Sequence, residues 1–214
     1  MSEPQDPPAL GRRAFIGGAT LAAAAGLAFR AASPAQAGEA MSDPMTADEV
    51  RTLLKLEPNQ TCGFVRVTYL SALKIAPGGL PAPFAEGRPL GSALYFMMTP
   101  EAPVKLHRIK NVQLYHYYLG DPIEVLMLHV DGTHSRATVG PDLGAGQTVQ
   151  LFIPGNTFHT ARIIGARPWF LGGSTEWPGV VPAEDVELGN ADELAAKYPE
   201  VAADIRSFPV PASP

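Results

Sequence analysis

The sequence predicts an all-β domain with a short helix at each end. Of its 214 residues, 21 are glycine and 22 are proline, while 46% are hydrophobic and only 17% are charged. A disordered chain needs the opposite balance of apolar and charged residues, and collagen needs a three-residue glycine period that is absent here. The middle of the chain consists of short apolar runs separated by turn residues. This pattern is typical of a β-sandwich or β-barrel.

A helix is predicted at the start of the domain, after residue 45. Thr46 and Glu49 have the spacing of a capping box, in which each side chain bonds the other residue's backbone N–H. Val50, Leu53 and Leu54 follow at helical spacing and are expected on one side of this helix.

The expected strands are short runs rich in β-branched and aromatic residues. Glycine, proline, asparagine and aspartate separate nearly all of them, as at Asp131-Gly132 and Pro154-Gly155-Asn156. Residues 76–89 contain clusters of proline and glycine and are predicted to form a long loop. The strands are expected over residues 63–71, 92–99, 114–119, 123–130, 136–139, 148–153, 158–164 and 169–175.

A second helix is predicted at the end of the domain. Asn190 and Glu193 have capping-box spacing, and an apolar series at helical spacing follows. That series consists of Leu194, Tyr198, Val201 and Ile205. The proline-rich residues 209–214 are expected to be a disordered tail, so the predicted domain covers residues 46–208.

The first 37 residues have the order of a secretory signal. Arg12-Arg13 precedes an apolar stretch over residues 19–29, and Ala35-Gln36-Ala37 supplies small residues for cleavage. The arginine pair resembles a twin-arginine export signal. Residues 38–45 are then a flexible lead-in, and the mature protein is expected in the periplasm or secreted. The apolar stretch is too short for a membrane span, so the cleaved protein is not expected to be an integral membrane protein.

Charge and cysteine content argue against a nucleic-acid-binding protein and against a fold held by disulfides. With 16 basic and 21 acidic residues the net charge is −5, which is unlike the basic surface of a nucleic-acid-binding protein. The single cysteine, Cys62, cannot form an intramolecular disulfide. We interpret it as a small buried residue rather than a nucleophile.

Histidine spacing resembles two motifs of the cupins. Gly146 followed by Pro154 and His159 resembles the second motif, and His107 followed by Gln113 and Gly120 resembles the first. The resemblance implies a jelly-roll barrel (a double-stranded β-helix) in which three histidines and one carboxylate hold iron, manganese, nickel or zinc. In this sequence Ile109 stands at the second histidine position and Gln113 at the carboxylate position.

The chain is most similar to a branch of small cupins of unassigned function. Residues 115–122 (YHYYLGDP) and 140–143 (GPDL) are among the segments that carry this similarity, which extends from Thr46 to Phe208. The resemblance implies a homodimer with a small-molecule pocket in the barrel, and it relates the fold to sugar-nucleotide epimerases. It does not imply a reaction.

The resemblance and the strand positions together predict which residues form the site. His107, Gln113 and His159 are the candidate metal ligands, and His107 and Tyr115 the candidate catalytic residues. His116 is expected on the opposite strand face from residue 115. His107 could equally be a structural histidine that bonds a backbone carbonyl, and Tyr95, Tyr115 and Tyr117 could equally be ordinary barrel core. The candidate ligand-binding residues are Arg66, Tyr95, Gln113, Tyr117 and Phe158.

Three functional hypotheses follow, and whether the protein is an enzyme stays open. The first is an exported cupin that binds a small polar metabolite, with a degraded ligand set and no obligatory metal. The second is a metal-dependent oxygenase or isomerase using His107, Gln113 and His159. The third is an epimerase-like enzyme with His107 as general base and a tyrosine as acid. For the third, the sequence shows no carboxylate placed to orient the histidine.

Overall fold

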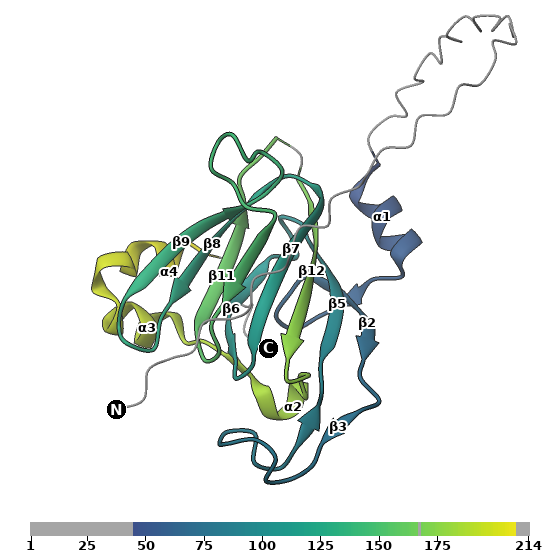
Figure 1. Ribbon diagram of the computed structural model, residues 1–214. Coiled ribbons are helices and arrows are strands. Elements are labelled where there is room, and N and C mark those ends of the chain that lie inside the picture. Colours follow the sequence, from purple (N-terminus) through teal and green to yellow (C-terminus); the bar gives the residue numbers. More distant parts are fainter. Residues whose placement is uncertain (1–44, 167, 209–214) are drawn as a thin grey trace, which may run out of the picture. The chain divides into compact units, whose positions relative to one another are not determined.

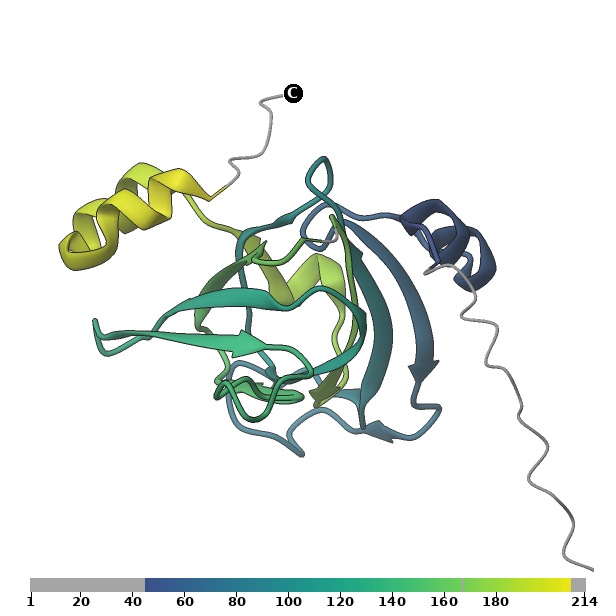
Figure 2. The same cartoon turned by 90° about the horizontal axis from the view of Figure 1, so that it is seen from above.

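The structure is a computed structural model that describes residues 45–166 and 168–208. The predicted signal peptide, most of the predicted lead-in and the predicted tail lie outside the described residues. Two antiparallel sheets face each other and form the jelly-roll arrangement that the resemblance implied (Figures 1 and 2). The fold prediction is therefore confirmed.

The larger sheet has six strands in the order β1-β2-β5-β12-β7-β10, and the smaller has five in the order β13-β6-β11-β8-β9. The larger comprises β1 (Glu57–Pro58), β2 (Phe64–Leu70), β5 (Ser92–Met98), β12 (Phe170–Trp177), β7 (Val112–Gly120) and β10 (Gln150–Ile153). The smaller comprises β13 (Val186–Leu188), β6 (Val104–Ile109), β11 (Phe158–Ile163), β8 (Ile123–Leu128) and β9 (His134–Val139). β3 (Lys74–Ile75) immediately precedes the predicted long loop and pairs with β4 (Arg88–Pro89) at the end of that loop.

Four α-helices and one 3-10 turn complete the described chain: α1 (Ala47–Leu54), α2 (Pro182–Asp185), α3 (Ala191–Lys197), η1 (Pro199–Val201) and α4 (Ala202–Ser207). The capping box of α1 is confirmed, because Thr46 and Glu49 exchange both bonds. Leu53, however, is exposed rather than on the buried side with Val50. Asn190 caps α3 by accepting from the N–H groups of Asp192 and Glu193.

The sheets are packed on both faces. Between them lies a core that includes Phe96, Tyr115 and Phe170. On the outer face of the smaller sheet, α3 and α4 pack their apolar residues against Leu106 and Leu126 (Figure 1). On the outer face of the larger sheet, α1 places Val50 against Met97 and its neighbours. The helices therefore cover sheet surfaces that would otherwise expose apolar side chains.

Glycines at the two motif positions are required by the backbone. Gly120 ends β7 at a φ of 89°, where an added Cβ would lie only 2.4 Å from the carbonyl oxygen of Trp169. Gly146 has a φ of 79° in the loop before β10. L-residues with side chains rarely adopt such φ values, so glycine is needed at both turns.

Candidate ligand-binding cavity

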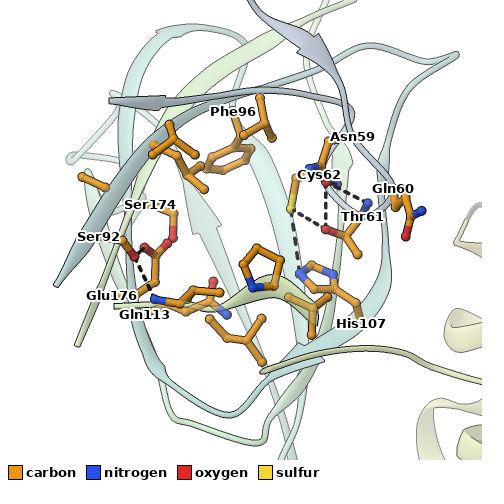
Figure 3. Close-up of a pocket in the computed structure, with 18 of the residues that line it drawn as sticks. Asn59, Gln60, Thr61, Cys62, Ser92, Phe96, His107, Gln113, Ser174 and Glu176 are labelled. Carbon is orange, nitrogen blue, oxygen red and sulfur yellow. Dashed lines mark hydrogen bonds between the residues drawn. The ribbon is translucent and has the colours of Figure 1, made fainter. Parts of the chain in front are cut away.

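A cavity of about 630 Å³ lies inside the barrel. Its walls come from both sheets and from the segment that enters α2, which lies at one end of the ring of strands (Figures 1 and 2). Much of the lining is aliphatic, namely Val65, Val67, Leu70, Leu94, Ile109, Val180, Val186 and Leu188. The polar side chains lie in two groups on opposite sides of the cavity (Figure 3).

The first polar group centres on His107, which β6 directs into the barrel with only 2% of its surface exposed. Its Nδ1 lies 2.8 Å from the carbonyl oxygen of Lys105. A carbonyl only accepts hydrogen bonds, so Nδ1 carries the proton and Nε2 keeps a lone pair. That lone pair faces the Cys62 Sγ at 3.8 Å. Burial lowers the pKa of His107 to about 4, so the ring is neutral at pH 7.

His159 lies directly behind His107, and the two ring centroids are 4.3 Å apart. It is fully buried, and it is fixed in the same tautomer because its Nδ1 donates to the Thr157 carbonyl at 3.1 Å. Its Nε2 accepts the Tyr115 hydroxyl at 3.0 Å. Burial and the neighbouring His107 hold the pKa of His159 well below its usual range. His159 is not among the residues that line the cavity.

A divalent metal does not fit this donor set. For His107, Gln113 and His159 to bind one ion, His159 would have to break its hydrogen bond with Tyr115. Ile109 lines the cavity beside them and has no donor atom. Within the described residues, no three His, Cys, Asp or Glu side chains are grouped closely enough to hold a metal.

The second polar group centres on Glu176, which β12 directs into the cavity with 2% of its surface exposed. Ser92 donates its hydroxyl to Oε2 of Glu176 at 2.6 Å and accepts the Val180 N–H at 3.2 Å. Ser174 lies close enough to lower the pKa of Glu176, but its hydroxyl forms no hydrogen bond of good geometry. Burial outweighs both serines and raises the pKa of Glu176 above its usual range.

Strand alternation explains which predicted residues are absent from the cavity. Val65 and Val67 line it, so Arg66 between them points to the other face, where its guanidinium lies over the ring of Tyr95 at 5.4 Å. Tyr95 itself alternates with Leu94 and Phe96, which face inward. The prediction that Arg66 and Tyr95 belong to the pocket is thus corrected.

Two further predicted ligand-binding residues, Tyr117 and Phe158, also lie outside the cavity lining. Tyr117 packs against the barrel core beyond the cavity, where its hydroxyl donates to the Gly120 carbonyl at 2.8 Å. Phe158 precedes the inward His159, faces outward, and packs against the α3–α4 cluster. His107, Gln113 and Tyr115 do line the cavity. His116 lies on the opposite face of β7, as predicted, where it contacts Thr175 and Gln150.

Glu176, Ser92 and Cys62 are cavity residues that the sequence interpretation missed. The predicted strand ended at residue 175, one residue before the carboxylate. The strand continues to residue 177, and alternation along it places Ser174 and Glu176 on the same face. This alternation was the sequence signal that could have identified Glu176. Cys62 is half-buried, and the surface it exposes lines the cavity.

Cys62 is expected to be a poor nucleophile. Burial raises the pKa of its thiol to about 11, and the thiolate is the reactive form. At pH 8 its alkylation by iodoacetamide should be slower than that of a free thiol by on the order of 100-fold. Alkylation of the guanidinium-unfolded protein, followed by mass spectrometry, provides the control. Alkylation of the folded protein at the rate of a free thiol would instead indicate a thiolate paired with protonated His107.

The two facing antiparallel sheets and the cavity between them define a cupin-type jelly-roll protein. The chain belongs to the family described as Cupin superfamily (DUF985), or Cupin_5, whose profile matches residues 48–188. No curated protein matches the sequence.

Two solved structures share the fold across nearly their whole length. A hypothetical protein from Leishmania major has 23% sequence identity and a TM-score of 0.69, over 78% of this chain and 99% of that one. A protein from Shewanella oneidensis has 24% identity and a TM-score of 0.67, with the same shares of each chain covered. At these identities the similarity shows the fold alone.

Proposed function

We propose that this protein is a small-molecule-binding cupin whose ligand occupies the barrel cavity without an obligatory metal. The observation that carries the proposal is a cavity of about 630 Å³ with an aliphatic lining and two inward polar groups. This combination is typical of ligand sites, in which apolar walls bury the ligand and a few polar groups orient it. Glu176 and His107 both have shifted pKa values, which is common at functional sites.

The cellular setting forms part of the proposal. The twin-arginine-type leader supports export to the periplasm or secretion, and the family supports a homodimer. No helix in the described segments is both long and apolar enough to cross a membrane. Catalysis by His107 and Tyr115 has less support, because the Tyr115 hydroxyl is bonded to His159.

Blocking the cavity should abolish ligand binding without unfolding the protein. Val67 lines the cavity yet is 61% exposed, so Val67→Trp adds bulk at the cavity with little strain in the core. Tyr69→Trp is the matched control, because Tyr69 is 58% exposed on the same strand and does not line the cavity. A fragment library should be screened by ligand-observed NMR against the wild type and both variants.

We expect fragments to bind the wild type and the Tyr69→Trp variant, and to lose most of their signal with Val67→Trp. The melting temperatures of the three proteins should agree within a few degrees. A wild type that binds no fragment, or fragments that bind the Val67→Trp variant equally well, would contradict the proposal.

A further inference from the structure

Glu176 is the one carboxyl group among the described residues that line the cavity, and no lysine or arginine is among them. The remaining titratable lining groups are His107, Cys62 and Tyr115. His107 is neutral at pH 7, since its pKa is about 4, and burial raises the pKa values of Cys62 and Tyr115. None of these groups therefore brings a positive charge to the carboxyl.

The immediate neighbours of Glu176 are neutral as well. Ser92 and Gln113 are its partners across the two neighbouring strands, and Ser174 lies two residues before it on β12. Figure 3 shows these four side chains gathered on one side of the cavity. Burying an ionised carboxylate without a cation costs several kcal/mol, and the hydrogen bond from the Ser92 hydroxyl offsets only part of that cost. A cation that approaches from the cavity would supply the charge partner that the carboxylate lacks among these neighbours.

The same arrangement disfavours acidic ligands. A ligand carboxylate or phosphate would enter a space without a cationic side chain and with an acidic group already present. Near Glu176 the walls are aliphatic, with Val67, Leu70 and Leu94 contributed by β2 and β5. Such walls suit the hydrocarbon part of a ligand.

We propose that the cavity binds small aliphatic amines, with the protonated nitrogen at the Glu176 carboxylate and the hydrocarbon part against the aliphatic wall. This inference rests on the proposed function and specifies the ligand class. Glu176 is then the residue that selects for charge, and the cavity dimensions limit the length of the hydrocarbon part.

Three ligands that share one hydrocarbon chain test the charge selection. Hexylamine, hexanol and hexanoate should be titrated into the full-length mature protein at pH 7.5 by isothermal calorimetry. Hexylamine is expected to bind about tenfold more tightly than hexanol, and hexanoate most weakly, because only the amine pairs with the buried acid. Hexanoate binding as tightly as hexylamine would overturn the inference and leave the proposed function standing.

Two variants test whether the preference for the amine depends on the Glu176 side chain. Glu176→Gln keeps the side-chain volume and removes the charge, so hexylamine affinity should fall about tenfold while hexanol affinity changes less than about threefold. Glu101→Gln, an exposed position outside the cavity, changes net charge equally and should leave all three affinities unchanged. An amine preference that survives Glu176→Gln would overturn the inference. So would failure of all three compounds to bind the wild type, and the fragment screen would then show whether the proposed function fails too.

Discussion

Replacing Asp185 by alanine is expected to lower the free energy of unfolding by about 3–5 kcal/mol. Asp185 is buried at the end of α2 and accepts two hydrogen bonds from the equally buried Arg88, at 3.3 and 3.0 Å. It also accepts the Val181 N–H at 2.8 Å. Removal of the carboxylate leaves the Arg88 guanidinium buried, and its remaining polar partners among the described residues are the half-exposed Glu184 and the Gly87 carbonyl. Urea unfolding measures the loss.

Two variants separate this buried pair from the surface charge beside it. Glu184 also pairs with Arg88, but its side chain is 53% exposed, so Glu184→Gln should cost less than about 1 kcal/mol. The double replacement Arg88→Met with Asp185→Leu should recover most of the stability, because no unpaired charge remains buried. A loss for Asp185→Ala no larger than that for Glu184→Gln would refute the argument.

The pair also matters for the cavity. It connects β4, at the end of the long loop, to α2, and Pro182 and Ala183 of α2 line the cavity. The ion pair thereby holds β4 and α2, which have little strand pairing of their own, at the same end of the barrel. Weakening the pair should loosen the cavity wall before the sheets unfold.

Acidification is expected to destabilise the folded protein through its two buried histidines. An unfolded histidine binds a proton near pH 6.5, whereas folded His107 does so only near pH 4. Between these values the unfolded state holds more protons, so stability falls as pH falls through this window. The contribution of His107 alone reaches about 3 kcal/mol by pH 4. His159, whose pKa is also lowered, acts in the same direction.

Glu176 opposes this trend, because its raised pKa makes the folded state hold a proton that the unfolded state has lost. Its stabilisation is present below pH 4.5 and is lost as pH rises through the raised pKa. Urea unfolding of the wild type, His107→Asn and Glu176→Gln from pH 7.5 to pH 4 separates the two effects. As pH falls, the free energy of unfolding should decrease less in the His107→Asn variant than in the wild type, and more in the Glu176→Gln variant. Identical slopes for the wild type and His107→Asn would show that His107 is not buried neutral.

Much of the fold was predictable because its signals are local. The capping box at Thr46 needs only four residues, and β2, β5, β7, β8 and β12 are long enough to show runs of β-formers. The missed elements are short or mixed in polarity, namely β1, β3, β4, β6, β13 and α2. The predicted C-terminal helix is interrupted at Tyr198, because Pro199 cannot donate the next helical hydrogen bond. Its apolar series is buried nonetheless.

The site was less predictable because it depends on pairing between distant strands. His107 and His159 are register partners across β6 and β11, and their motif spacing was visible in the sequence. Which face Arg66 or Tyr95 occupies depends on register relative to the whole barrel, and a shift of one residue reverses it. Glu176 meets Ser92 only because β5 and β12 pair, across 84 positions of sequence. No local pattern encodes that contact.

The Ser92 hydroxyl has a consequence beyond the local geometry of Glu176. It donates to the carboxyl and accepts from the Val180 backbone, so one oxygen atom connects an ionisable group to the polypeptide leading into α2. A change in the charge or partners of Glu176 alters the strength of both bonds, because a hydroxyl that donates more strongly also accepts more strongly. The carboxyl group in the cavity and the chain that enters α2 are thus hydrogen-bonded to the same oxygen atom, so the position of one constrains the position of the other.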